Sequence, residues 1–193
     1  MKKLIIITLC FLSTHAFSQS LTALQYSIGF GTGDLGSYIS KPSFRGVAID
    51  FRKLVTPSIG VGFELGWHVF YEGQSGETYT RGNLTYSGNQ YRYNNQFPAL
   101  FAADYYLKPG EKINPFAGLG LGVMYSLRDT DMNQYRLTQE AWNFTLRPEI
   151  GVLIEANAST SLMISGKYYH GFEAGELPTQ SYFALNFGLV FKK

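Results

Sequence analysis

The chain has 193 residues, of which 16% are aromatic and 21 are glycine, and its formal net charge at pH 7 is +2. Such an even balance leaves no basic surplus for nucleic acid, so a nucleic-acid partner is excluded. The single cysteine, Cys10, lies in the first apolar run, so the rest of the chain can form no disulfide.

Residues 1–18 read as a cleavable signal peptide. Lys2 and Lys3 precede an apolar run from Leu4 to Leu12, and a small-x-small cleavage site ends at Ser18. The run is far shorter than the ~20 apolar residues that a membrane-spanning helix needs. We therefore predict cleavage after Ser18 and a single domain formed by residues 19–193.

Eight further segments alternate large apolar residues with small or polar ones at a period of two, which is typical of half-buried strands. The third is the clearest, with Ile59, Val61 and Phe63 beginning one apolar face, and the seventh is the weakest. Pro98 and Pro148 lie inside two segments, and because the alternation continues across each proline we expect locally irregular strands there. The segments cover residues 24–31, 47–52, 58–71, 97–107, 117–127, 142–154, 162–169 and 182–191.

The connections between these segments alternate in length. Tight turns at 53–57, 108–113 and 155–160 alternate with long polar connections at 32–43, 72–95 and 128–140, and 173–179 is intermediate. Short turns on one side and long loops on the other are typical of outer-membrane barrels, which keep both termini on the periplasmic side. Trp67, Tyr125 and Trp142 lie near segment ends, where aromatic girdles meet the membrane interface.

Charged residues within the segments avoid the bulky apolar face. A charge on a lipid-facing position at mid-bilayer costs about 2–4 kcal/mol. We therefore predict an all-β, eight-stranded antiparallel up-and-down transmembrane β-barrel in the bacterial outer membrane, with its apolar face toward lipid. The alternative fold is a soluble lipocalin-like barrel, with its apolar face inward around a ligand. In the transmembrane barrel the lumen encloses seven charged residues: Asp50, Arg52, Glu64, Asp104, Arg147, Glu149 and Lys167.

Three stretches carry a resemblance to known proteins. Residues 97–107 form a strand with an early proline, and residues 114–120 follow as a Pro-aromatic, Gly-x-Gly strand. Asn186, Gly188 and Phe191 close the chain with the spacing of a C-terminal assembly signal, although Lys193 replaces the usual final aromatic. The chain thus resembles the bacterial outer-membrane β-barrel domain family, which includes PorT-like and OmpA-like small barrels. This resemblance implies an outer-membrane location and the barrel-assembly machinery as a partner during biogenesis.

An eight-stranded barrel is narrow enough for side chains to fill its interior. We expect the seven charges to pair as an ionic network that plugs the lumen and holds the strands in register, because buried charges must be paired. The alternative is a gated ion path or narrow channel. No residue pattern predicts a cofactor, and the two histidines of the mature chain, His68 and His170, form no metal-binding cluster.

Enzymatic and binding functions are the remaining hypotheses. A lipid-A-modifying hydrolase needs a His–Ser pair and a carboxylate at the lipid-facing rim, and no His-x-Ser spacing accompanies His170. We therefore predict a non-enzymatic protein with a structural, envelope-assembly or surface-interaction role. Residues 72–95 include Tyr79, Tyr86 and Tyr91, a composition used by adaptable recognition surfaces for an envelope or surface protein partner. Alternatively, these tyrosines merely extend the hairpin above the bilayer.

Overall fold

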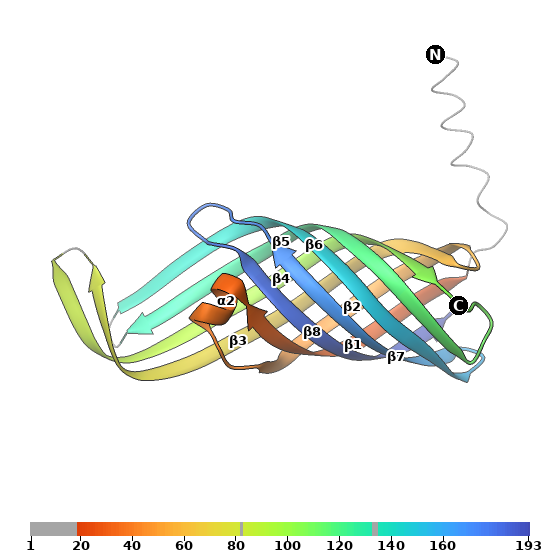
Figure 1. Ribbon diagram of the computed structural model, residues 1–193, viewed down its shortest axis with the longest axis horizontal. Coiled ribbons are helices and arrows are strands. Elements are labelled where there is room, and N and C mark those ends of the chain that lie inside the picture. The colour runs from red at the N-terminus through yellow and green to blue at the C-terminus, as the bar shows by residue number, and fades with distance from the viewer. Residues whose placement is uncertain (1–18, 82, 133–134) are drawn as a thin grey trace, which may run out of the picture.

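The computed structural model describes residues 19–81, 83–132 and 135–193, and the predicted signal peptide, residues 1–18, lies outside them. Eight antiparallel strands close into a barrel in chain order, with β8 paired to β1 (Figure 1). This confirms the predicted up-and-down barrel. The strands are β1 (Ser20–Thr32), β2 (Ser43–Thr56), β3 (Ile59–Arg81), β4 (Leu84–Tyr106), β5 (Ile113–Met132), β6 (Tyr135–Asn157), β7 (Thr160–Gly171) and β8 (Gln180–Lys192).

One short helix, α2 (Gly33–Tyr38), follows β1 within the connection that was predicted as the loop 32–43. Leu35 and Ile39 are fully buried, and these two side chains pack into the neighbouring end of the barrel. Within the described ranges, no helix is both long and apolar enough to span a membrane.

The barrel is apolar outside and polar inside, as predicted. Phe63, Leu121 and Phe187 are 45%, 49% and 42% exposed, whereas Glu64 and Arg147 are completely buried. A soluble barrel would reverse this arrangement, because its apolar side chains would fill the interior. The exterior therefore fits hydrocarbon, and the lipocalin-like alternative is wrong.

Pro98 and Pro148 lie inside strands, and each interrupts one hydrogen-bonded ladder without changing its register. The β3–β4 pairing runs from Leu65↔Ala99 to His68↔Gln96 and skips Pro98. The β6–β7 pairing likewise skips Pro148 with no shift. Proline lacks the N–H that a ladder needs, so pairing is lost only locally. The preserved register explains why the sequence alternation continues across each proline.

Two of the predicted loops are strands. Connections 72–95 and 128–140 were predicted as loops, but β3 and β4 pair as far as Arg81↔Leu84, and β5 and β6 as far as Met132↔Tyr135. Pairing of β3 with β2 ends at His68, and pairing of β6 with β7 ends at Thr145. Beyond those positions the four strands pair only with one another. We call this part, residues 69–81, 83–95, 127–132 and 135–143, the projecting sheet.

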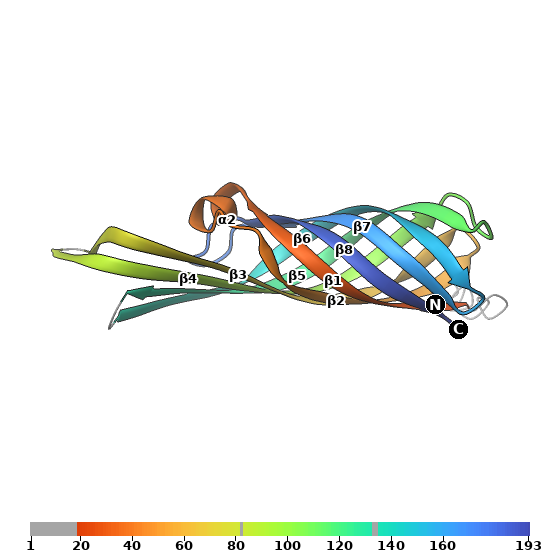
Figure 2. The same ribbon diagram turned by 90° about the horizontal axis from the view of Figure 1, so that it is seen from below.

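The projecting sheet extends past one end of the barrel, at the end where α2 lies (Figures 1 and 2). The C-terminus and the short turns lie at the opposite end. Because outer-membrane barrels keep their termini and short turns in the periplasm, this arrangement directs the projecting sheet away from the cell. The alternative that residues 72–95 extend the hairpin above the bilayer is therefore confirmed. The loop prediction for 128–140 was wrong because its polar residues give no apolar alternation, although they pair as strands.

Candidate functional site

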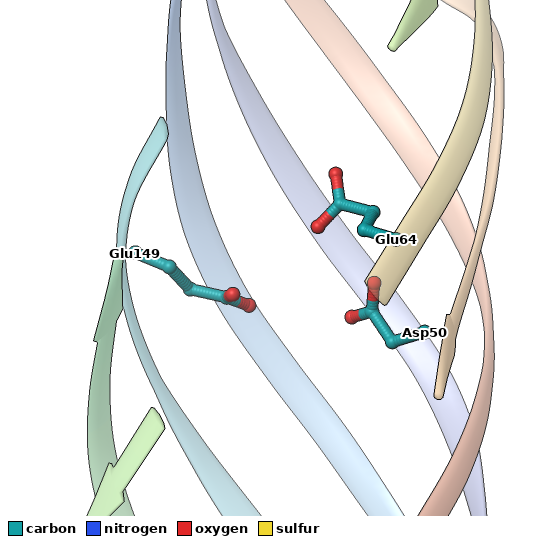
Figure 3. Close-up of side chains that lie close together, drawn as sticks. All are labelled: Asp50, Glu64 and Glu149. Atoms are coloured by element: carbon teal, nitrogen blue, oxygen red, sulfur yellow. The ribbon is translucent and has the colours of Figure 1, made fainter. Parts of the chain in front are cut away.

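Three acidic side chains converge inside the barrel. Asp50 of β2, Glu64 of β3 and Glu149 of β6 point toward one another (Figure 3), and one oxygen of each lies within 4.8 Å of the others. Lys167 Nζ lies 3.0 Å from Asp50 Oδ2, 2.8 Å from Glu64 Oε2 and 3.9 Å from Glu149 Oε1. The ammonium group of the chain itself therefore takes the position that a bound cation would occupy.

Two arginines extend this cluster. Arg147 Nη2 lies 3.0 Å from Glu64 Oε2, and Arg147 Nη1 donates to Glu149. Arg52 Nε donates to Asp104 Oδ2 at 2.6 Å, and Arg52 Nη2 lies 3.8 Å from Asp50 Oδ1. The structure thus brings all seven of the sequence-predicted charges into one connected group, here called the ionic network. Each of the seven is at most 5% exposed.

Neutral side chains complete the hydrogen bonding of the ionic network. The Tyr169 hydroxyl donates to Glu64 Oε1, and the Gln25 amide donates to Asp50 Oδ2. These contacts matter because the network contains four carboxylates and only three cations. A buried carboxylate is tolerated when cations and hydrogen-bond donors surround it. Sequence reasoning missed both donors because the strand register places them, not a motif.

Glycines of β5 make room for the ionic network. Gly118 pairs with Asp104 on one side and Glu149 on the other, and a Cβ at Gly118 would clash with the Asp104 carboxylate. At Gly120 a Cβ would lie 3.1 Å from Arg147 Nε. Because Gly118 and Gly120 carry no side chain, the Asp104 carboxylate and the Arg147 guanidinium have room to lie against β5. The glycine-rich alternation in this strand is therefore explained by packing.

The ionic network lies between two apolar layers. Toward the chain termini, Leu21, Tyr106 and Phe116 belong to one buried cluster. A cavity of about 20 Å³ lies between this cluster and the network, enough for about one water molecule. Toward the projecting sheet, Phe70 and Tyr182 belong to a second buried cluster, which also includes the α2 residue Leu35. The described side chains of the network and the two layers thus close the middle of the lumen.

His68 lies in the second layer. Its Nδ1 is 3.1 Å from the Tyr182 hydroxyl, and its ring packs on the rings of Tyr169 and Tyr182. The ring is 1% exposed. The sequence placed His68 on the lumen side near Glu64, and Tyr169 connects them by contacting both. A histidine held among buried tyrosines is suited to packing and does not meet lipid or solvent.

The structure reveals a His–Ser contact that the sequence did not show. His170 Nδ1 lies 2.8 Å from Ser181 Oγ, because the two residues are cross-strand partners on β7 and β8. Ser181 is only 3% exposed, and the His170 ring packs on Tyr168 and Phe172. In the described part of the chain, no carboxylate lies within hydrogen-bond distance of His170. The pair thus lacks both an accessible nucleophile and the third member of a hydrolase triad.

The α2 segment is fastened to the projecting sheet. The Tyr38 hydroxyl lies 2.6 Å from Thr130 Oγ1, and the Arg128 Cζ lies 4.0 Å from the centre of the Tyr38 ring. On the other side, Glu72 Oε2 accepts a hydrogen bond of 2.6 Å from the Ser40 backbone N–H. Burial alone would raise the pKa of the Glu72 carboxyl. The hydrogen bonds from Ser40 outweigh this effect, so the pKa of Glu72 lies below its ordinary value.

Aromatic side chains on the outer surface mark the boundary of the membrane. Trp67, Phe97, Tyr125 and Trp142 stand on four successive strands, with ring centroids 5.9, 6.2 and 5.0 Å apart. Aromatic rows of this kind lie at the interface between hydrocarbon and water. The projecting sheet begins at this row, so its strands continue into the aqueous phase.

The predicted assembly-signal residues take different environments. Asn186 is completely buried and accepts a hydrogen bond from the Ser27 hydroxyl. A Cβ at Gly188 would lie 2.7 Å from Gln25 Cγ, so glycine is needed for close packing at the β1–β8 seam. Phe191 is 50% exposed on the outer surface. Of the three, Phe191 is therefore the side chain that a receptor could contact in the folded barrel.

An apolar exterior, an enclosed ionic network and eight antiparallel strands define the class of small outer-membrane β-barrels. No protein-family model and no curated protein matches the chain. Several solved structures are similar to the chain. One is Ail, the attachment invasion locus protein of Yersinia pestis, in complex with the heparin analogue sucrose octasulfate. Its similarity has a TM-score of 0.58 at 12% sequence identity, over 92% of this chain and 99% of that one.

Two further solved structures share the fold. Neisserial surface protein A has a TM-score of 0.55 at 10% identity, over 91% of this chain and 97% of its own. OprG, an outer membrane protein of Pseudomonas aeruginosa, has a TM-score of 0.56 at 16% identity, over 93% of this chain and 97% of its own. These similarities show the fold of small bacterial outer-membrane barrels, in agreement with that part of the resemblance.

Proposed function

We propose that this chain is a non-enzymatic surface-interaction protein of the bacterial outer membrane. In this proposal the filled barrel is an anchor, and the projecting sheet is the part that meets a partner outside the cell. The observation that carries the proposal is the continuation of β3 and β4 as a paired hairpin far beyond the aromatic row. The filled lumen supports an anchor over a channel, and predicts no conductance above background in planar bilayers.

Strand length supports a role beyond anchoring. A transmembrane strand needs about 9–11 residues. β3 and β4 each have 23 residues, and β6 has 23 as well. A hairpin that served only to hold the barrel in lipid would end near the aromatic row. The additional length therefore serves something in the aqueous phase.

The surface of the projecting sheet suits recognition. Tyr71 and Tyr91 are 37% and 43% exposed, and the rings of Tyr71 and Tyr93 lie 4.8 Å apart. Exposed tyrosines provide large contact area at a low cost in conformational entropy. The outer edge of β3 after His68 pairs with no neighbouring barrel strand, and neither does the outer edge of β6 before Thr145. Such edges offer backbone groups to a partner strand.

The experiment shortens the β3–β4 hairpin. Residues 75–89 are replaced by Asn-Gly, which joins the paired residues Gln74 and Gln90 through a two-residue turn. Proteins captured by cross-linking on intact cells are then compared by quantitative mass spectrometry. We expect partners of the full-length chain to be depleted at least about tenfold, as when a central contact region of an interface is removed.

A matched control changes the other end of the barrel. Glu111→Ser alters an exposed residue of the short β4–β5 turn and should leave the captured partners unchanged. Heat-modifiable migration on gels should first be used to check that both variants form barrels. An identical set of partners for the full-length and shortened chains would refute the proposal.

A role in envelope assembly remains a narrower version of this proposal. The PorT-like resemblance suggests a scaffold for secretion or envelope assembly, and residues 72–95 would then bind an envelope protein rather than an external one. The same capture experiment separates these cases by the identity of the captured protein. We further propose that Asn186, Gly188 and Phe191 serve as the signal read by the barrel-assembly machinery, which Phe191→Ala tests through a reduced yield of inserted barrel.

A further inference from the structure

Two arginines lie side by side on the inner face of the projecting sheet. Arg92 of β4 pairs with Thr130, and Arg128 of β5 pairs with Asn94, so the two arginines occupy diagonal cross-strand positions. Their Cζ atoms lie 5.1 Å and 4.0 Å from the centre of one ring, that of Tyr38. Diagonal neighbours on one face are close enough for long side chains to meet.

Neither guanidinium forms an ion pair with a carboxylate among the described residues, although Glu72 of β3 lies opposite Arg92 in the strand pairing, where its carboxylate accepts hydrogen bonds from Ser40. Arg92 Nε donates to Gln90 Oε1 at 2.7 Å, and Arg92 Nη1 donates to the Tyr38 carbonyl at 3.0 Å. Arg128 is 9% exposed, and its buried Nε and Nη2 have no hydrogen-bond acceptor. Asp34 acts on Arg128 only at longer range, and its carboxylate accepts a hydrogen bond from Thr179.

A buried cation without a counterion is costly, and a second cation beside it adds repulsion. Every cation of the ionic network contacts at least one carboxylate. The Arg92–Arg128 pair differs, because neither of its guanidinium groups does. We propose that this pair, beside Tyr38, binds a phosphate or sulfate ester group of a soluble ligand outside the cell. This inference names a ligand class for the projecting sheet and so rests on the proposed function.

The chemistry of the donors selects this ligand. Guanidinium groups present planar, forked N–H donors that match the oxygens of phosphate and sulfate, and their charge persists at any physiological pH. The inner face of the sheet points away from the surrounding lipid. The position therefore favours a group on a soluble ligand over a phosphate of the neighbouring lipid head groups.

The test titrates the purified full-length protein, in detergent free of lipopolysaccharide, with inorganic phosphate and then inorganic sulfate. Arginine Nε signals are followed by nuclear magnetic resonance. We expect saturable shifts of the Arg128 signal with an apparent Kd of roughly 1–10 mM, as for one small anion. Arg128→Gln should weaken binding at least about tenfold, because it removes a charge-assisted donor.

Arg136→Gln is the matched control, because Arg136 is exposed and already pairs with Asp131 through Nε at 2.5 Å. It should bind both anions as the unchanged protein does. Equal binding by Arg128→Gln, or no saturable shift up to about 50 mM, would overturn the proposal, since millimolar affinity is the least expected of a specific anion site. Shifts produced only by vesicles containing lipopolysaccharide would overturn the assignment to a soluble ligand.

The outcome is separable from that of the hairpin experiment. The variant that lacks residues 75–89 keeps Arg92, Arg128 and Tyr38. If shortening the hairpin removes partners but no anion binds, the proposed function stands and this ligand class fails. If anions bind with the expected dependence on Arg128 but partners are unaffected by shortening, this site stands and the role of the hairpin fails.

Discussion

The barrel lumen and the projecting sheet both enclose arginine side chains, but they treat the charge differently. In the lumen, Arg147 contacts Glu64 and Glu149, and Lys167 lies among three carboxylates. On the projecting sheet, the two arginines Arg92 and Arg128 contact one tyrosine ring, and Arg92 also contacts one amide oxygen and one backbone carbonyl. The lumen places every cation beside carboxylates and supplies hydrogen-bond donors to the excess carboxylate, as buried charges require. The sheet leaves these two guanidinium groups without an ion pair at a place where solvent or a ligand can supply one.

The largest effect should follow from removing the central cation of the lumen. Lys167→Met leaves Asp50, Glu64 and Glu149 with less compensation in a buried site. Loss of one partner of a buried ion pair costs about 3–5 kcal/mol. We expect a large fall in the urea midpoint of unfolding in vesicles, with little folded, heat-modifiable protein.

Lys108→Met is the control for this comparison. Lys108 pairs with Glu111 at 3.1 Å, but both side chains are more than half exposed. Exposed pairs contribute about 0–1 kcal/mol, so the urea midpoint should barely move. Equal midpoints for Lys167→Met and the unchanged protein would show that the ionic network does not stabilise the barrel.

An intermediate effect is expected from filling the space that the ionic network uses. Gly118→Val adds a side chain against the Asp104 carboxylate and should displace it from Arg52. Overpacking of this kind costs about 1–3 kcal/mol. The neighbouring Leu119→Val changes a lipid-facing side chain that is 53% exposed, and we expect a smaller shift of the urea midpoint. Equal shifts would mean that the lumen adapts to added volume.

The smallest effect concerns the contact between Glu72 and Ser40 at the base of the projecting sheet. Because the pKa of Glu72 is lowered in the folded protein, the ionised form is the one stabilised. This stabilisation is present above the ordinary pKa of about 4.3 and is lost as pH falls through the lower, folded-state value. Hydrogen-exchange protection of α2 should therefore decrease in acid.

Glu72→Gln sharpens this prediction, because the amide cannot ionise. Its α2 protection factors should be lower than those of the unchanged protein near pH 7 and should lack the additional acid-dependent loss. A charge-assisted hydrogen bond contributes about 1.5–3 kcal/mol when buried, and less at a partly solvated rim. Identical acid dependence in both proteins would assign the effect to another group.

Much of the barrel could be predicted from sequence because its pattern is local. In β3, large apolar residues alternate with glycines from Ile59 to Phe63, and this alternation shows which face meets lipid. The apolar exterior and the enclosed charges both follow from the same period of two. The seven charges of the ionic network could be assigned to one face for the same reason. Their pairing partners could not, because those depend on which strands lie opposite across the lumen.

Other features depend on long-range register or on weak local signals. The projecting sheet alternates polar residues and tyrosines, so no apolar face distinguishes its strands from loops. The contact of His170 with Ser181 arises from β7–β8 pairing, which no sequence spacing reveals. Helix α2 has six residues, of which two are glycine, so intrinsic propensity does not predict it. Burial of Leu35 stabilises it instead.

The most direct test of the central claim determines which end of the molecule faces outward. Cys10 is the only cysteine in the sequence, so Ser87→Cys on the projecting sheet and Glu111→Cys in the β4–β5 turn provide single probes of the mature chain. A membrane-impermeant maleimide should label position 87 on intact cells and position 111 only after the outer membrane is permeabilised. Labelling of position 111 alone on intact cells would contradict an anchored barrel that displays the projecting sheet to the outside.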